Sequence, residues 1–80
     1  MGGRSNPRSR ERVARNFVRT HGRTRFQLLI SGLRENKSGA VLGRELGVSR
    51  ERVRQWKNTF GETITHYKVY PEVQRLLDGR

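Results

Sequence analysis

The sequence predicts an all-α protein, a small domain of four to five helices with one short extended segment near the C-terminus. Two observations support this class. Apolar residues recur at the spacing of an amphipathic helix in successive stretches of the chain, and glycine or proline separates these stretches. Only residues 63–70 are instead rich in β-branched and aromatic side chains. With 80 residues, of which 31% are hydrophobic, the chain can form one domain with a thin core.

The N-terminal part of the sequence predicts a flexible tail followed by a helix. Residues 1–9 contain two glycines, an Asn-Pro pair and two arginines, which is typical of a flexible basic tail. Residues 10–20 are expected to be helical, because their apolar residues share one face. These residues are Val13, Ala14, Phe17 and Val18. Gly22 is expected to end this helix.

The middle of the sequence predicts two further helices. Thr24 and Gln27 have the spacing of a capping box, which predicts that Thr24 is the N-cap of the first of them. Its apolar stripe consists of Phe26, Leu29, Ile30 and Leu33. Residues 36–39 are expected to break it, and a short helix is expected over residues 40–46. Gly47 then permits a left-handed turn.

The next helix is the most regular segment of the sequence. Ser49 is a favourable N-cap, and the helix is expected to run to Phe60 and to end at Gly61. Val53 and Trp56 share one face with Phe60, at i, i+3 and i+7, and define the buried stripe. We therefore expect Trp56 to pack in the core rather than to stack on a base.

The C-terminal part predicts the extended segment and a last helix that begins at Pro71. An isolated extended segment is not stable. It could form half of a small wing, lie across the helices, or pair with its counterpart in a second copy. The number of apolar residues here favours a homodimer through residues 62–80. These apolar residues are Ile64, Tyr67, Val69, Tyr70, Leu76 and Leu77.

The composition favours an anionic partner. Lys and Arg number 18 against 7 Asp and Glu, which gives a net charge of +11, and 15 of the 18 are arginine. An excess of this size exceeds what solubility needs and favours nucleic acid, with an anionic membrane or an acidic protein as second choices. The chain has no cysteine, and no apolar run approaches the roughly 20 residues that cross a bilayer. We therefore expect a cytoplasmic, nucleoid-associated protein.

The helix that begins after Ser49 has a polar face suited to reading bases. Arginine pairs with guanine, glutamine and asparagine with adenine, and glutamate accepts from cytosine. Arg50 and Arg52 stand at the helix start, where the free N–H groups disfavour positive charge and bound phosphate would offset it. The expected base-reading residues are Arg50, Glu51, Arg54, Gln55 and Asn58.

The short helix, the glycine turn and the reading helix together form the pattern of a helix-turn-helix over residues 39–60. Gly43 inside the short helix indicates close approach of the next helix. The inner positions are Leu42, Leu46, Val48, Val53 and Trp56. The expected organisation is then a helical domain over residues 10–61, followed by the proposed dimerisation element over 62–80.

The stretch GVSRERVRQ, residues 47–55, resembles the recognition helix of region 4 of the primary bacterial sigma factors, and residues 39–60 resemble the wider helix-turn-helix superfamily. The resemblance implies that Arg50, Glu51 and Gln55 contact bases and that Arg54 contacts a phosphate or a base. Trp56-Lys57 departs from the sigma pattern, and 80 residues cannot contain the other sigma regions. The resemblance therefore implies a shared reading device and not a sigma factor.

The sequence thus predicts sequence-specific binding to double-stranded DNA by a bacterial or phage transcriptional regulator. Two alternatives stay open: an arginine-rich RNA-binding protein, and an adaptor that docks on RNA polymerase or another acidic partner. No catalytic, metal or cofactor site is expected, since His21 and His66 are isolated and the carboxylates are scattered. The expected DNA-backbone contacts are Ser49, Arg52, Arg44, Lys57, Arg12, Arg15, Arg19, Arg23 and Arg25.

Overall fold

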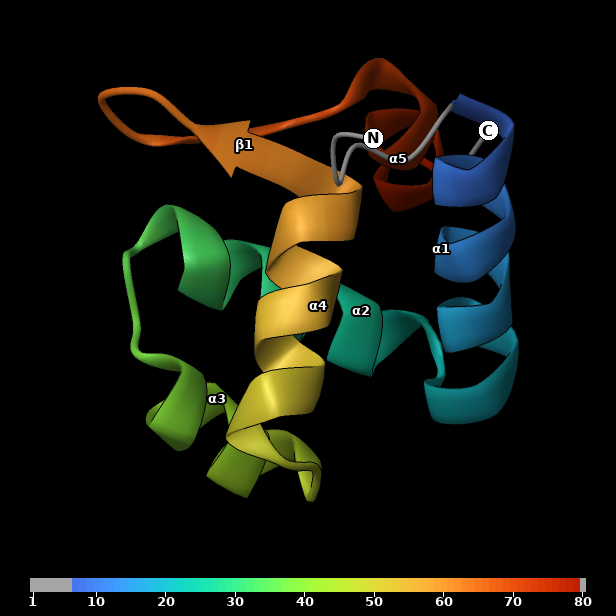
Figure 1. Ribbon diagram of the computed structural model, residues 1–80. Coiled ribbons are helices and arrows are strands. Elements are labelled where there is room, and N and C mark those ends of the chain that lie inside the picture. The colour runs from blue at the N-terminus through green and yellow to red at the C-terminus, as the bar shows by residue number, and fades with distance from the viewer. Residues whose placement is uncertain (1–6, 80) are drawn as a thin grey trace.

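The computed structural model describes residues 7–79, and the side chains from Ser9 onward (Figure 1). Five helices and a two-stranded sheet form this part of the chain, which confirms the predicted all-α class. Residues 1–6 of the predicted tail lie outside the described residues. The elements are α1 (Pro7–His21), α2 (Arg23–Arg34), α3 (Gly39–Leu46), α4 (Arg50–Phe60), β1 (Gly61–Thr63), β2 (Tyr67–Val69) and α5 (Pro71–Leu77).

The first two helices meet at a single residue, Gly22. Its φ of 94° is a conformation that favours glycine, and its N–H donates to the carbonyl of Val18 (2.9 Å). The same residue is the N-cap of α2, so the predicted capping box of Thr24 and Gln27 is wrong. Because α2 begins at Arg23, directly after Gly22, Thr24 lies inside the first turn of α2. At the other end, α1 begins at Pro7, three residues before the expected start, because proline suits the first turn of a helix.

Two serines cap the helices that follow. The hydroxyl of Ser38 accepts from the N–H of Val41 (3.1 Å) at the start of α3. The hydroxyl of Ser49 accepts from the N–H of Arg52 (3.1 Å) at the start of α4, as predicted. Gly47 between the two helices has φ 74° and ψ 32°, which confirms the left-handed turn.

Gly43 determines how closely α3 and α4 approach. The N–H of Val48 donates to the Gly43 carbonyl (2.8 Å), and a Cβ atom at Gly43 would lie only 2.7 Å from the carbonyl oxygen of Val48. No side chain fits in this space. The close approach predicted from the sequence is therefore confirmed.

One hydrophobic core joins all five helices and the hairpin. Its centre is a group of aromatic rings: Phe17 packs edge-on against Trp56, with 4.7 Å between centroids, and Phe26 packs against both Phe17 and Phe60 at 5.6 Å. Trp56 is 6% exposed, which confirms its expected place in the core. The other buried hydrophobic residues are Ala14, Leu29, Ile30, Leu33, Leu42, Leu46, Val53, Tyr67, Val69 and Val73.

The C-terminal extended segment is a β-hairpin and not a single strand. β1 pairs with β2 in antiparallel register, with Glu62 opposite Lys68, and three residues form the connection. The sequence did not predict this turn, because residues 64–66 contain no glycine or asparagine. The buried hydroxyl of Tyr67 donates to the carbonyl of Lys57 in the last turn of α4 (2.7 Å), which ties the hairpin to that helix. Burial also raises the pKa of Tyr67.

The apolar residues of the C-terminal part pack within the chain. Tyr67, Val69 and Val73 are buried, and Tyr70, Leu76 and Leu77 pack partly buried against the same core. Residues 62–80 therefore do not form a separate unit. The predicted homodimer rested on these residues, so most of its support is removed. Ile64 is the exception, with 74% of its surface exposed.

Helices α1 and α5 lie side by side, and α1 also contacts α4 (Figure 1). Arg10 joins them. Its guanidinium lies 3.7 Å from the ring centroid of Tyr70 and 3.5 Å from the carboxylate of Glu72. Arg10 thus adds polar contacts between the first and the last helix of the described chain, which also share the hydrophobic core.

We expect Gly43→Ala to destabilise the protein. Overpacking against the Val48 carbonyl costs about 1–3 kcal/mol, and the better helix propensity of alanine returns at most about 1 kcal/mol. Urea unfolding followed by circular dichroism measures the difference. Gly39→Ala is the matched control, because its Cβ would come tightly only against the flexible side chain of Arg50 (3.1 Å) and would lie at ordinary contact distance from the Arg50 carbonyl oxygen (3.6 Å). A Gly43→Ala variant as stable as the wild type would contradict the close-approach interpretation.

Candidate nucleic-acid interface

Helix α4 presents a continuous polar face to solvent. The side chains on this face are exposed, while Val53, Trp56 and Phe60 on the opposite face are buried. The division between inside and outside predicted from the helical wheel is therefore confirmed. Within the described residues, the side chains of Gln55 and Asn58 have no intramolecular hydrogen bond. The exposed polar residues of α4 are Glu51, Arg54, Gln55 and Asn58 on this face, with Arg50 and Arg52 at the helix start.

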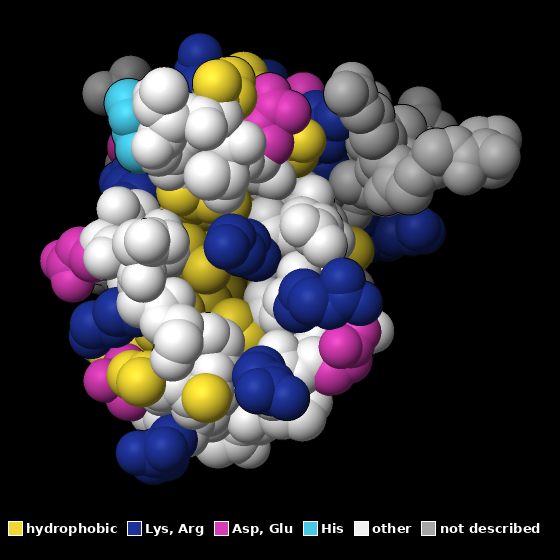
Figure 2. All heavy atoms as spheres, turned by 60° about the vertical axis from the view of Figure 1, so that its left-hand side comes forward, with side chains coloured by type: hydrophobic (Ala, Val, Ile, Leu, Met, Phe, Trp, Pro, Cys, Tyr) yellow, Lys and Arg dark blue, Asp and Glu magenta, His cyan; other side chains and the backbone are white. Residues whose placement is uncertain are grey.

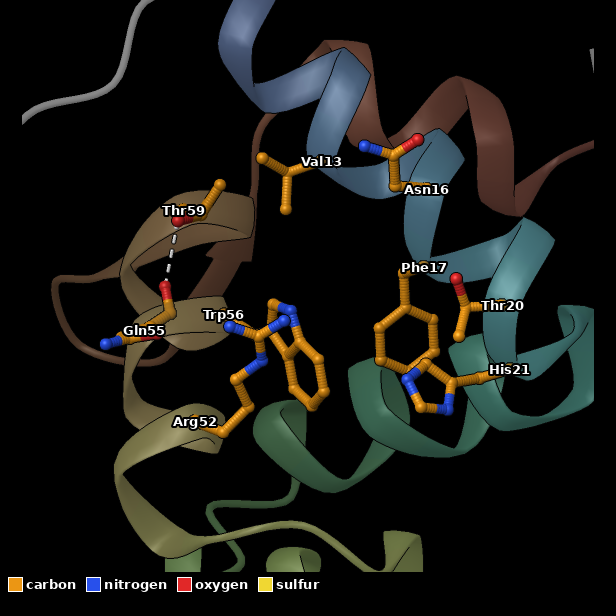
Figure 3. A pocket seen from close by; sticks show the side chains of 9 residues that line it. All are labelled: Val13, Asn16, Phe17, Thr20, His21, Arg52, Gln55, Trp56 and Thr59. Carbon is orange, nitrogen blue, oxygen red and sulfur yellow. Dashed lines mark hydrogen bonds between the residues drawn. The ribbon is translucent and has the colours of Figure 1, made fainter.

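A hollow of about 350 Å³ separates α4 from α1 (Figure 3). Its floor contains Phe17 and Trp56, and the ring of His21 packs on Phe17 with 4.6 Å between centroids. The guanidinium of Arg52 lies 5.2 Å from the centroid of Trp56. The remaining lining residues are Val13, Asn16 and Thr20 from α1 and Gln55 and Thr59 from α4.

A second hollow, of about 290 Å³, lies on the other side of α4, next to the connection between α2 and α3. Leu33 and Val53 are its apolar residues. Figure 2, which turns this side of the molecule forward, shows basic side chains gathered around a hollow with a hydrophobic floor. The basic residues that line it are Lys37, Arg50, Arg54 and Lys57. Helix α4 is thus a ridge between two hollows, with cations on both sides.

Two of the expected base-reading residues pair with each other. The guanidinium of Arg54 donates to the carboxylate of Glu51 through two nitrogens, at 2.9 and 3.2 Å. These hydrogen bonds, together with the charge of Arg54, lower the pKa of Glu51 and raise that of Arg54. Both side chains are largely exposed, so exchanging this pair for contacts to a ligand costs little.

Helix α1 extends the basic surface beyond the first hollow. Asn16 lines both this hollow and a shallower one on the outer face of α1. The shallower hollow is lined by the three expected backbone contacts of this helix, Arg12, Arg15 and Arg19. Arg15 pairs with Glu11 (2.8 Å), which lowers the pKa of that carboxyl group. The basic face of α1 is therefore continuous with the hollow beside α4.

Two other expected backbone contacts have structural partners. Arg23 donates to the carbonyl of Leu77 at the end of α5 (2.9 Å), and Arg25 donates to the carbonyl of Leu46 at the end of α3 (3.1 Å). Each guanidinium thus satisfies a helix C-terminus. Arg44 is exposed on α3 and lines neither hollow.

The sequence pattern did not single out several polar residues of the hollows. Asn16 and Thr20 lie one turn apart on the side of α1 that faces α4, and Thr59 continues the face of Gln55. Asn16 and Thr20 follow Val13 at helical spacing, which was the available signal. That spacing alone does not predict that the two side chains line a hollow, because the hollow depends on the packing of α1 against α4.

Comparisons with protein-family models, with curated proteins and with solved structures gave no match to this chain. Along residues 7–79, none of the helices combines the length and the apolar content needed to cross a bilayer. In the same part of the chain, no three His, Asp or Glu side chains are grouped as metal ligands would be.

We expect Glu51 to titrate at a lower pH than an ordinary glutamate, because Arg54 stabilises its ionised form. In Arg54→Ala the pKa of Glu51 should rise toward the usual value, and carboxyl ¹³C NMR titration measures both. Arg15→Ala is the matched control, since it should raise the pKa of Glu11 and leave Glu51 unchanged. An unaltered pKa of Glu51 in Arg54→Ala would show that the pair does not form in solution.

Proposed function

We propose that this protein binds double-stranded DNA in a sequence-dependent manner, with α4 in the major groove. The observation that carries the proposal is the position of α4 as an exposed polar ridge between two hollows with basic residues. A helix with its side chains is about 10–12 Å across, and the major groove is about 12 Å wide. The groove is bordered by two phosphate backbones, which the hollows on either side of α4 would accept.

The distribution of charge supports the same geometry. Arg52 borders the hollow on the α1 side, while Arg50 and Lys57 border the hollow on the other side. Cations on both flanks of a recognition helix match the two phosphate strands that flank a groove. The basic face of α1, with Arg12 and Arg19, would extend the contact along one strand.

The side chains on the exposed face of α4 are the proposed base readers. Glutamine, asparagine, arginine and glutamate together can address every base-pair edge in the major groove. Gln55 and Asn58 have free polar groups in the described structure, and Arg54 and Glu51 are released by opening one exposed ion pair. Arg50 borders the second hollow, so we now propose that it contacts a phosphate and not a base.

A transcriptional regulator is the role that we propose for such a protein, and we place it with the nucleoid. The proposal does not include a homodimer, because the apolar residues that favoured it lie in the chain's own core. One observation favours a second candidate. Arg12, Arg15 and Arg19 form an exposed cationic face on α1, which suits structured RNA or an acidic protein such as RNA polymerase.

Selection from a random pool of duplex DNA at near-physiological salt tests the proposal. We expect the recovered duplexes to share one short sequence, because α4 presents few base-reading side chains. A single half-site is expected from a monomer, and a palindrome would restore the dimer. Binding without enrichment that disappears as salt rises would refute sequence-dependent reading and favour the second candidate.

The variants Gln55→Ala and Arg12→Ala should act differently. Gln55→Ala should alter preference at one or two base pairs and cost about 1–3 kcal/mol at those positions, whereas Arg12→Ala should weaken all sequences alike and reduce the salt slope by about 1. Fluorescence anisotropy at several salt concentrations measures both effects. Both side chains are exposed, so each variant should fold as the wild type does. Equal effects of the two variants on all sequences would contradict the proposed base-reading face.

A further inference from the structure

The tip of the β-hairpin has a feature that the proposed function does not use. Ile64 stands in the connection between β1 and β2 with 74% of its surface exposed. The other exposed large hydrophobic residues of the described chain, Leu28 and Val41, reach only 39% and 38%. Transfer of this apolar side chain from water into a contact with a partner would be favourable.

The base of the hairpin is fixed, although its tip projects. β1 begins at the residue after α4, and the N–H of Tyr70 donates to the carbonyl of Phe60, the last residue of α4 (2.8 Å). The Tyr67 hydroxyl binds the Lys57 carbonyl, and Val69 is buried. The position of Ile64 is therefore coupled to the position of the recognition helix.

The hairpin projects on the side of α4 that carries the second hollow. In Figure 1 it leaves the end of α4 and extends over the C-terminal end of α2, and Leu33 from that end of α2 lines the hollow. Strands rise about 3.3 Å per residue, so the tip projects by about 10 Å. In our proposed complex this hollow accepts one phosphate backbone. The minor groove lies directly beyond that backbone.

We propose that the hairpin tip enters the minor groove beside the α4 site, and that Ile64 acts as a wedge that partly unstacks one base step and kinks the duplex. This inference rests on the proposed function. Apolar wedges of this kind, isoleucine among them, bend DNA toward the major groove. The hydroxyl of Thr63, which precedes Ile64, can donate to the acceptor atoms of the minor-groove edge, whereas the hydroxyl of Thr65 is paired with Nδ1 of His66 (3.2 Å). Pyrimidine–purine steps unstack most easily, so we expect one at the contacted position.

A second copy of the chain is a less suitable partner for Ile64. A stable interface buries about 800 Å² on each partner, with many residues on each side. The tip offers one apolar side chain among exposed polar neighbours, because Tyr67 and Val69 are turned into the core. This surface is too small for a dimer, but its single side chain is sufficient to enter one base step.

The experiment uses duplexes recovered in the selection, with 2-aminopurine placed at each flanking step in turn and a donor–acceptor dye pair at the two ends. Binding of the wild-type protein should raise the 2-aminopurine fluorescence at one step outside the α4 site and shorten the end-to-end distance. Ile64→Ala should abolish both signals and weaken binding about tenfold. Thr65→Ala, the matched control at the same tip, should retain both signals. Ile64 is exposed, so its substitution leaves the core intact.

Three other results would refute the wedge. If the wild type produces neither signal, or if Ile64→Ala retains both, the wedge is refuted while the α4 site stands, because sequence enrichment is measured separately. If the selection gives no enrichment, the proposed function itself fails, and the wedge fails with it. If sedimentation reveals a wild-type dimer that Ile64→Ala dissociates, the partner of Ile64 is a second copy and the wedge is refuted.

Discussion

The packing of α4 against the aromatic rings of the core is the constraint on which the rest of the structure depends. Val53, Trp56 and Phe60 fill one face of the helix along its whole length, and Phe17 and Phe26 hold that face in place. Because a helix has only one rotational setting that buries such a stripe, the opposite face is turned to solvent along its whole length. Burial of the apolar stripe is therefore sufficient to expose the polar ridge, and no hydrogen bond or ion pair on the ridge itself is needed for this.

A second constraint fixes where the ridge begins. The contact of Gly43 with the Val48 carbonyl and the left-handed turn at Gly47 bring α3 against the start of α4. The Ser49 cap then determines the residue at which α4 starts, and so which side chains of its first turn point to each flank. Backbone geometry thus positions the cations on the two flanks of α4, which would reduce the ordering cost of the proposed DNA binding.

The sequence was sufficient for features that depend on neighbouring residues. The caps at Ser49 and Gly47, the buried stripe of α4 and the close approach at Gly43 are local patterns, and the structure confirms them. Features that depend on distant residues could not be predicted. The partners of Arg23 and Arg25 are carbonyls 54 and 21 residues away, and the hairpin is held by Tyr67, whose partner lies on α4. The two hollows also needed the structure, because each is lined by residues from separate elements.

The clamp that Arg10 forms with Tyr70 and Glu72 has a consequence for how the chain folds. It joins segments about 60 residues apart, so it can close only after residues 70–72 are available. Contacts of such long range slow folding, because the entropy of loop closure is lost before the contact forms. During synthesis the contact of α1 with α5 forms only after α5 is made, and Trp56 on α4 packs against Phe17 of the same α1. The polar ridge would therefore acquire its final setting only after α5 has left the ribosome.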